Sequence, residues 1–330
     1  MLILAKSVLG LMLGFILSLI TAVVLIPFLR KLNAGQTVSR LINKRHLKKD
    51  GTPTIGGLIF IIPTIAIMVL LYLRESIELS HNLIIVLFVF IAYGILGFAD
   101  DYIKIKYKNN NGFNTLTKLF LQIVIALVFY GIFRQHGGDS TLIISSLGIT
   151  IPMGWAFGIF ILLVLVGTAN AVNITDGLDG LCGGLSVMAF LAYGMIAWGT
   201  TWLTGHQELA IFSFVLVGSL LGFLVFNTHP AKVFMGDTGS MALGAALATI
   251  AILTRHELSL VLIGGVFVAE TLTSLIQIIS IRKFNKKIFL KAPLHHHFEE
   301  LGWAENDIVK LFWVIGLLLA MVGIIYGVWL

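Results

Sequence analysis

The sequence predicts an all-α polytopic membrane protein with about ten transmembrane helices in a single domain, residues 1–330. Two observations carry this prediction. Of the 330 residues, 58% are hydrophobic and only 12% are charged, whereas soluble domains carry roughly 25% charged residues. The mean hydropathy is +0.99. This composition excludes a soluble globular enzyme.

Ten apolar segments approach the length of about 20 residues that a spanning helix needs. The first follows only Lys6 and ends in Pro27-Phe28-Leu29-Arg30 with no small-residue cleavage site, so we expect a retained helix. The predicted spans are 7–29, 55–73, 83–99, 116–133, 153–172, 181–202, 209–226, 239–253, 258–281 and 308–330.

The basic residues predict how these helices are oriented. Ten spans place both termini on one side, and 18 of the 22 Lys and Arg residues then lie on the other. The positive-inside rule therefore predicts a cytoplasmic basic side and external termini. The orientation of the helices in the membrane explains the excess of basic residues. The net charge of +6 is therefore no indication of a nucleic-acid partner, and none is expected. The basic segments are 30–54, 99–118, 173–180, 227–238 and 282–310.

Outside the helices, segment 139–152 alternates apolar residues around Ser145-Ser146-Leu147-Gly148, a pattern typical of a small β-hairpin, here on the external side. The single cysteine, Cys182, excludes an intramolecular disulfide and a Cys-rich metal site. Any metal must be held by oxygen or imidazole ligands.

Five aspartates lie in or beside three of the predicted cytoplasmic segments: Asp100, Asp101, Asp176, Asp179 and Asp237. Any one of them has an alternative explanation as a solvated loop residue or a helix cap. Five on one face, in Gly- and Asn-rich surroundings, favour a functional site.

Asp100 and Asp101 end the third span. If the helix continues by one turn, Lys104 lies at i+4 and i+3 from them, on the same face. Such a trio binds a hard cation through oxygen and meets a phosphate through the ammonium group. An ordinary surface ion pair is the alternative.

Two glycine-rich motifs follow. In NAVNITDGLDGLCGG, Asn173, Asp176 and Asp179 recur at i+3 and are expected to line one side of a polar pocket, unless the segment is only a turn. In GDTGS, Asp237 begins the eighth span, where a helix N-terminus attracts phosphate. Asp237 is then either an N-cap or a Mg²⁺ ligand, and Phe234 offers a stacking face for a base.

The last cytoplasmic segment contains three consecutive histidines, 295–297. Side chains of adjacent residues diverge, so donors to phosphate or ribose are favoured over a zinc site. Segment 46–57, HLKKDGTPTIGG, is a basic entry to the second span that also contains Thr54. In the ninth span, Glu270 and Gln277 lie two turns apart. An ionisable residue there is a functional candidate, although Glu270 could equally bond neighbouring helices.

Carboxylates, lysines and histidines on one membrane face fit Mg²⁺-assisted phosphoryl transfer between a soluble and a lipid phosphate. The strings DDYIK (100–104), NxxDGLDGL (173–181), GDTGS (236–240) and HHH (295–297) resemble the polyprenyl-phosphate N-acetylhexosamine-1-phosphate transferases. GTPTIGG (51–57) and APLHHHFE (292–299) resemble the phospho-N-acetylmuramoyl-pentapeptide branch of that family, which acts in bacterial peptidoglycan synthesis.

The resemblance implies transfer of phospho-MurNAc-pentapeptide from UDP-MurNAc-pentapeptide to undecaprenyl phosphate, giving lipid I and UMP. It also implies a Mg²⁺ cofactor, a homodimer among membrane lipids, and a bacterial cytoplasmic membrane location with the active site on the cytoplasmic face.

By the same resemblance, Asp100 is the candidate base, and Asp101, Asp176 and Asp237 serve the metal. Lys104 and His295 complete the catalytic set. The implied substrate-binding residues are Lys49, Thr54, Lys118, Asn173, Asp176, Gly177, Leu178, Asp179, Asn227, Phe234, Gln277 and His296.

Two alternatives remain open at this point. A related transferase would use another UDP-HexNAc donor, and only the HHHF string separates it from the first reading. A cation-coupled transporter would keep its polar groups near the membrane midplane, and Glu270 is the candidate for such a group. The sequence shows no convincing internal repeat, which disfavours the transporter.

Overall fold

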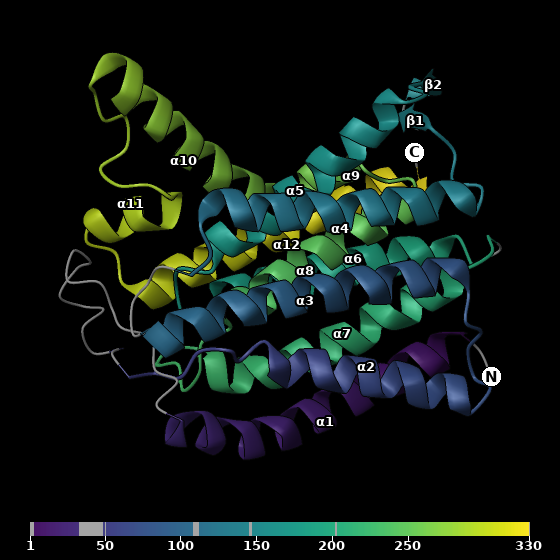
Figure 1. Cartoon of the computed structure of the whole chain (residues 1–330), viewed down its shortest axis with the longest axis horizontal. Coiled ribbons are helices and arrows are strands. Elements are labelled where there is room, and N and C mark those ends of the chain that lie inside the picture. The colour runs from purple at the N-terminus through teal and green to yellow at the C-terminus, as the bar shows by residue number, and fades with distance from the viewer. Residues whose placement is uncertain are drawn as a thin grey trace.

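The computed structural model describes residues 3–32, 49, 51–107, 112–144, 147–201 and 203–329. Within them, long helices run side by side as a bundle, with one small hairpin (Figure 1). The elements are α1 (Ile3–Lys31), α2 (Leu58–Leu73), α3 (His81–Tyr107), α4 (Thr115–Gln135), β1 (Thr141–Ile144), β2 (Ile149–Pro152), α5 (Ala156–Thr175), α6 (Leu181–Gly199), α7 (His206–Asn227), α8 (Gly236–Leu253), α9 (Ser259–Ile263), α10 (Gly265–Phe284), α11 (Leu294–Glu300) and α12 (Glu305–Trp329).

The predicted all-α membrane fold is confirmed. Nine helices in the described ranges are long and apolar enough to cross a membrane, and α2, with 16 residues, is a shorter apolar helix. Helix α2 begins at Leu58, three residues later than predicted, because the chain before it pairs with the segment before α8. The Gly56 and Gly57 amides donate to the Phe234 and Met235 carbonyls at 2.8 and 2.9 Å.

The predicted span 258–281 is not one continuous helix. It divides into the short α9 and the longer α10, and the backbone leaves helical geometry at Gly264. A tandem glycine, Gly264-Gly265, has little intrinsic preference for a continuous helix. Helix α10 leans away from the bundle towards one end of the molecule, where α11 lies beneath it (Figure 1).

The predicted hairpin is confirmed. Strands β1 and β2 are antiparallel, with Thr141 opposite Pro152 and Ile144 opposite Ile149. The hairpin, the start of α1 and the end of α12 all lie towards one end of the bundle, and α11 lies at the other (Figure 1). This arrangement agrees with an even number of crossings.

Helix α8 forms the centre of the bundle and is buried along most of its length. It packs against α3 on one side and α5 on another. At its N-terminus, contact with α3 is very close, because a Cβ atom on Gly97 would overlap the Asp237 carbonyl. The C-terminal turns of α3 therefore lie directly against the first turn of α8.

Candidate active site

Three carboxylates meet where α3 passes the start of α8. Asp100, Asp101 and Asp237 each offer an oxygen, and these atoms all lie within 4.8 Å of one another. Asp100 and Asp101 are buried, whereas Asp237 keeps 15% of its side chain exposed. Since like charges repel at such separations, the cluster requires positive partners.

Two lysines supply that charge. As the i+4 spacing predicts, the Lys104 ammonium lies 2.6 Å from Asp100, and it also lies 2.9 Å from Asp237. Lys118, from α4, donates to the same Asp237 oxygen at 2.5 Å. Asn173 donates to the other Asp237 oxygen at 2.8 Å. Four helices, α3, α4, α5 and α8, thus converge on Asp237.

Asp101 caps helix α8 from a different part of the chain. Its carboxylate accepts the Asp237 amide at 3.1 Å, and the Thr238 amide and hydroxyl at 2.9 and 2.7 Å. The first amides of a helix lack intrahelical acceptors. The expectation that this helix end presents free amides to phosphate is therefore not met at these two amides, because Asp101 occupies them.

Asp100 is enclosed by the chain that leads into α4. The Phe113 amide donates to its Oδ1 at 2.7 Å. A Cβ atom on Gly112 would overlap the carboxylate, so the backbone passes directly over it. The predicted base consequently has one oxygen held by an amide and the other by Lys104.

Asn173, Asp176 and Asp179, which recur at i+3, do not lie on one face of a helix. Helix α5 ends at Thr175 and Asp176 is its C-cap, so helical periodicity stops within the motif. Asn173 contacts Asp237, whereas Asp179 turns towards other partners. Asp176 lies outside the close trio of carboxylates, which contains Asp100 instead. Burial, reinforced by the nearby carboxylates, raises the pKa of Asp176 to about 8.

Asp179 belongs to a second charged cluster. Lys49 lies 2.7 Å from Asp179 and 2.6 Å from Glu305, and Glu305 also accepts the Asp179 amide at 2.7 Å. His229 Nδ1 lies 3.0 Å from the other Asp179 oxygen. Glu305 and His229 were not predicted from the sequence. Glu305 lies 126 positions from Asp179, and no local pattern connects them.

Three of the implied substrate-binding residues lie beside this second cluster: Gly177 and Leu178 precede Asp179 in the chain, and Asn227 bonds the residue after it. Asn227 is buried and joins two turns, accepting the Gly180 amide at 3.1 Å and donating to the Val233 carbonyl at 2.9 Å. Leu178 is buried, and Gly177 is exposed. Phe234 is partly exposed, while Thr54 is buried beside Gly236. Residues 46–48 and 50 of the basic motif before Thr54 lie outside the described residues.

The histidine motif forms α11, where His295 has its partner on α10 and His296 has its partner on α11 itself. His295 Nδ1 lies 3.0 Å from Glu270, and His296 Nδ1 lies 2.6 Å from Glu299. Burial lowers the pKa of His296. Gln277 contacts backbone: its oxygen accepts the Ile288 and Phe289 amides, and its nitrogen donates to the Phe289 carbonyl. Gln277 thus holds the connection between α10 and α11.

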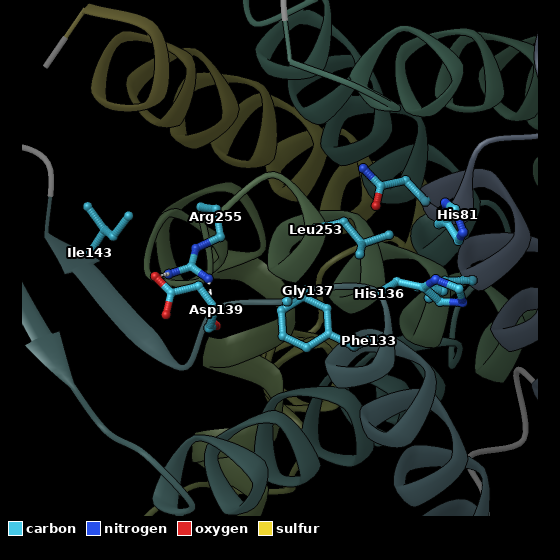
Figure 2. A pocket seen from close by; sticks show the side chains of 11 residues that line it. His81, Phe133, His136, Gly137, Asp139, Ile143, Leu253 and Arg255 are labelled. Atoms are coloured by element: carbon cyan, nitrogen blue, oxygen red, sulfur yellow. Dashed lines mark hydrogen bonds and ion pairs between the residues drawn. The ribbon is translucent and has the colours of Figure 1, made fainter.

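A separate cavity of about 350 Å³ lies near the hairpin, at the other end of α3. Figure 2 shows the rings of His81 and His136, 3.8 Å apart and tilted by 45°, on one side and Arg255 with Asp139 on the other. Arg255 donates to the Asp139 carbonyl at 2.8 Å and the Thr141 hydroxyl at 2.7 Å, and so anchors the hairpin. This cavity contains none of the predicted site residues.

Comparison with known proteins supplies the family. The model for glycosyl transferase family 4 matches residues 82–255, more than half of the chain. Proteins named phospho-N-acetylmuramoyl-pentapeptide-transferase are 49% identical in Bacillus licheniformis, over 96% of both chains, and 48% identical in Bacillus subtilis, over 97% of both. One from Geobacillus kaustophilus is 45% identical over 98% of both chains. The chain is therefore an enzyme that belongs to the phospho-N-acetylmuramoyl-pentapeptide-transferase family of glycosyl-1-phosphate transferases.

Proposed function

We propose that this enzyme transfers phospho-MurNAc-pentapeptide from UDP-MurNAc-pentapeptide to undecaprenyl phosphate, forming lipid I and releasing UMP. The observation that carries the proposal is the convergence of Asp100, Asp101 and Asp237 with Lys104 and Lys118 at one end of the bundle. Carboxylates that hold a cation, beside ammonium groups that meet phosphate, suit the transfer of a charged phosphoryl group.

The carboxylate trio fits a hard divalent cation such as Mg²⁺, which prefers oxygen ligands. Asp237 is the first choice, because it is partly exposed and its contacts are side chains able to move. Asp101 is proposed to act mainly by capping the first turn of α8 and so positioning Asp237. Its own oxygens already accept hydrogen bonds from amides and a hydroxyl. We keep Asp176 as a further proposed ligand. When bound, the cation would neutralise charge on the donor diphosphate and polarise its phosphorus.

The other side chains have distinct proposed roles. Asp100 is the proposed base that accepts the proton of the lipid phosphate, with Lys104 at 2.6 Å to stabilise its charged form. Lys104 and Lys118 would turn from Asp237 to the phosphates as the donor binds. Asp179 and Asn227 are proposed to hold the uridine. Lys49 would then have to leave the Asp179 carboxylate and contact the bound nucleotide instead.

The site is proposed to face the cytoplasm of a bacterial cell, in the cytoplasmic membrane. This is supported by the placement of 18 of the 22 basic residues in segments on the predicted inner side. A soluble nucleotide donor would then reach the site from water, and the lipid acceptor from the surrounding bilayer. A homodimer is part of the same proposal.

The test is UMP release by the purified protein in detergent, with UDP-MurNAc-pentapeptide, undecaprenyl phosphate and Mg²⁺. Release with this donor, abolished by EDTA, is the expected result. Release only with UDP-GlcNAc would keep the reaction type and change the substrate. No release with either donor, from protein shown to be folded, would refute the proposal. Membership of a transferase family removes the reason to retain the transporter alternative.

A further inference from the structure

A buried acid and histidine connect α10 to α11. Glu270 is fully buried, and His295 is 1% exposed. One Glu270 oxygen accepts the His295 backbone amide at 3.1 Å, and the other lies 3.0 Å from the ring Nδ1. A carboxylate in so apolar a place requires strong donors to offset lost hydration. The same residue supplies both donors, so the side chain of His295 is held at two points.

This double contact determines which edge of the imidazole faces the candidate site. Nδ1 faces a carboxylate oxygen, which accepts hydrogen bonds when ionised, and this contact favours the tautomer with its proton on Nδ1 and a free lone pair on Nε2. Within the described residues, Nε2 is buried and has no hydrogen-bond partner. It lies against the turn after α5, because a Cβ atom on Gly177 would overlap it. Gly177 is exposed, so the residue that covers Nε2 also faces solvent.

We propose that Glu270 is a positioning residue of the transferase: it holds His295 so that an unpaired Nε2 is presented beneath the Asp176–Gly177 turn. This rests on the proposed function, which places the nucleotide donor at that turn. With the ring neutral, Nε2 accepts a hydrogen bond from the donor. With the ring protonated, it donates to phosphate while Glu270 stabilises the imidazolium.

A purely structural role for Glu270 is the competing explanation. The carboxylate also caps the first turn of α11, so its loss could displace the whole helix. The two explanations differ in one respect. Positioning acts through the imidazole, whereas capping acts through the backbone amide, which remains when the ring is removed. A double-mutant cycle between Glu270 and His295 therefore separates them.

The kinetic arm measures UMP release for Glu270→Gln, His295→Ala and the double variant. Gln retains an acceptor but no charge, so we expect kcat to fall about tenfold with little change in the donor KM. In the His295→Ala background, Glu270→Gln should lower kcat by less than about twofold. An equal loss in both backgrounds would overturn the proposal. Thr273→Val, one turn along α10, is the control, because the Thr273 hydroxyl donates to the Ala269 and Glu270 carbonyls of its own helix.

The spectroscopic arm does not depend on turnover. In protein labelled with ¹⁵N-histidine, the His295 signals are assigned by their loss in His295→Gln. The proposal expects a neutral ring protonated at Nδ1, and a mixture of tautomers in Glu270→Leu. The opposite neutral tautomer in the parent protein, protonated at Nε2 alone, would overturn it. If the parent protein releases no UMP with any donor, the proposed function fails, and this arm still decides whether Glu270 orients the ring.

Discussion

Substituting Gly97 by alanine tests whether close packing of α3 on α8 assembles the acidic site. A Cβ atom there would overlap the Asp237 carbonyl and lie 2.7 Å from the Thr238 nitrogen, against about 3.4 Å for ordinary contact. The helices must therefore separate by at least about 0.7 Å. Because both neighbouring atoms belong to backbone, no side-chain rotation relieves the overlap.

That separation is enough to break the cap on α8. The Thr238 amide lies 2.9 Å from Asp101 and would move to about 3.6 Å, beyond hydrogen-bonding distance. We expect the overpacking and the lost cap to lower the free energy of unfolding by about 1–3 kcal/mol. The displacement of Asp237 from the α3 carboxylates should lower kcat by about 10- to 100-fold.

The assay pairs UMP release with thermal unfolding in the same detergent. Gly131→Ala is the matched control, because it makes the same substitution inside α4, where a Cβ atom meets nothing within 4 Å. This control also measures the gain in helix propensity, up to about 1 kcal/mol. If Gly97→Ala turned over and unfolded like Gly131→Ala, the argument from helix contact would be wrong.

Three further predictions test the site, the pH dependence of stability, and the topology. Asp237→Asn should lose most Mg²⁺-dependent UMP release while unfolding near the parent temperature, and full activity would remove Asp237 from the proposed metal ligands. Burial raises the pKa of Glu257 from 4.5 to about 7, so with respect to this group the fold is most stable below pH 4.5 and loses stability as the pH rises from there through 7. At pH 8 the cost is about 3 kcal/mol, so Glu257→Gln should unfold at a higher temperature than the parent at pH 8 and at nearly the same temperature at pH 5. For topology, an impermeant thiol reagent should label Lys287→Cys only from the cytoplasm and Asp139→Cys only from outside, and the reverse pattern would invert the predicted orientation.

The parts of the fold that depend on local sequence were predictable. Apolar length gave the helices, and alternation gave the β1–β2 hairpin. The spacing of Asp100 and Lys104 gave their ion pair, because both lie on one continuous helix. The break at Gly264 was missed since apolar residues continue across it, and hydropathy does not respond to backbone geometry.

The contacts that assemble the candidate site were not predictable, because they join distant parts of the chain. Asp101 caps a helix 136 residues away, and Glu305 accepts an amide 126 residues away. The i+3 spacing predicted a shared face for Asn173 and Asp179, but the helix ends between them. The two residues therefore belong to different clusters. Residue types at motif positions indicated the chemistry, while helix packing decided which residues meet.

The charges at the candidate site explain why metal and donor should bind together. Three carboxylates face two ammonium groups, so the cluster of Asp100, Asp101, Asp237, Lys104 and Lys118 retains one net negative charge when all five are ionised. A divalent cation alone would reverse this to a net positive charge among buried groups, which is unfavourable unless an anion accompanies it. The nucleotide diphosphate of the proposed donor would supply that anion and offer the two lysines new partners. The lysines paired with Asp237 are the same groups that would meet the donor phosphates, so this exchange of partners favours joint occupancy.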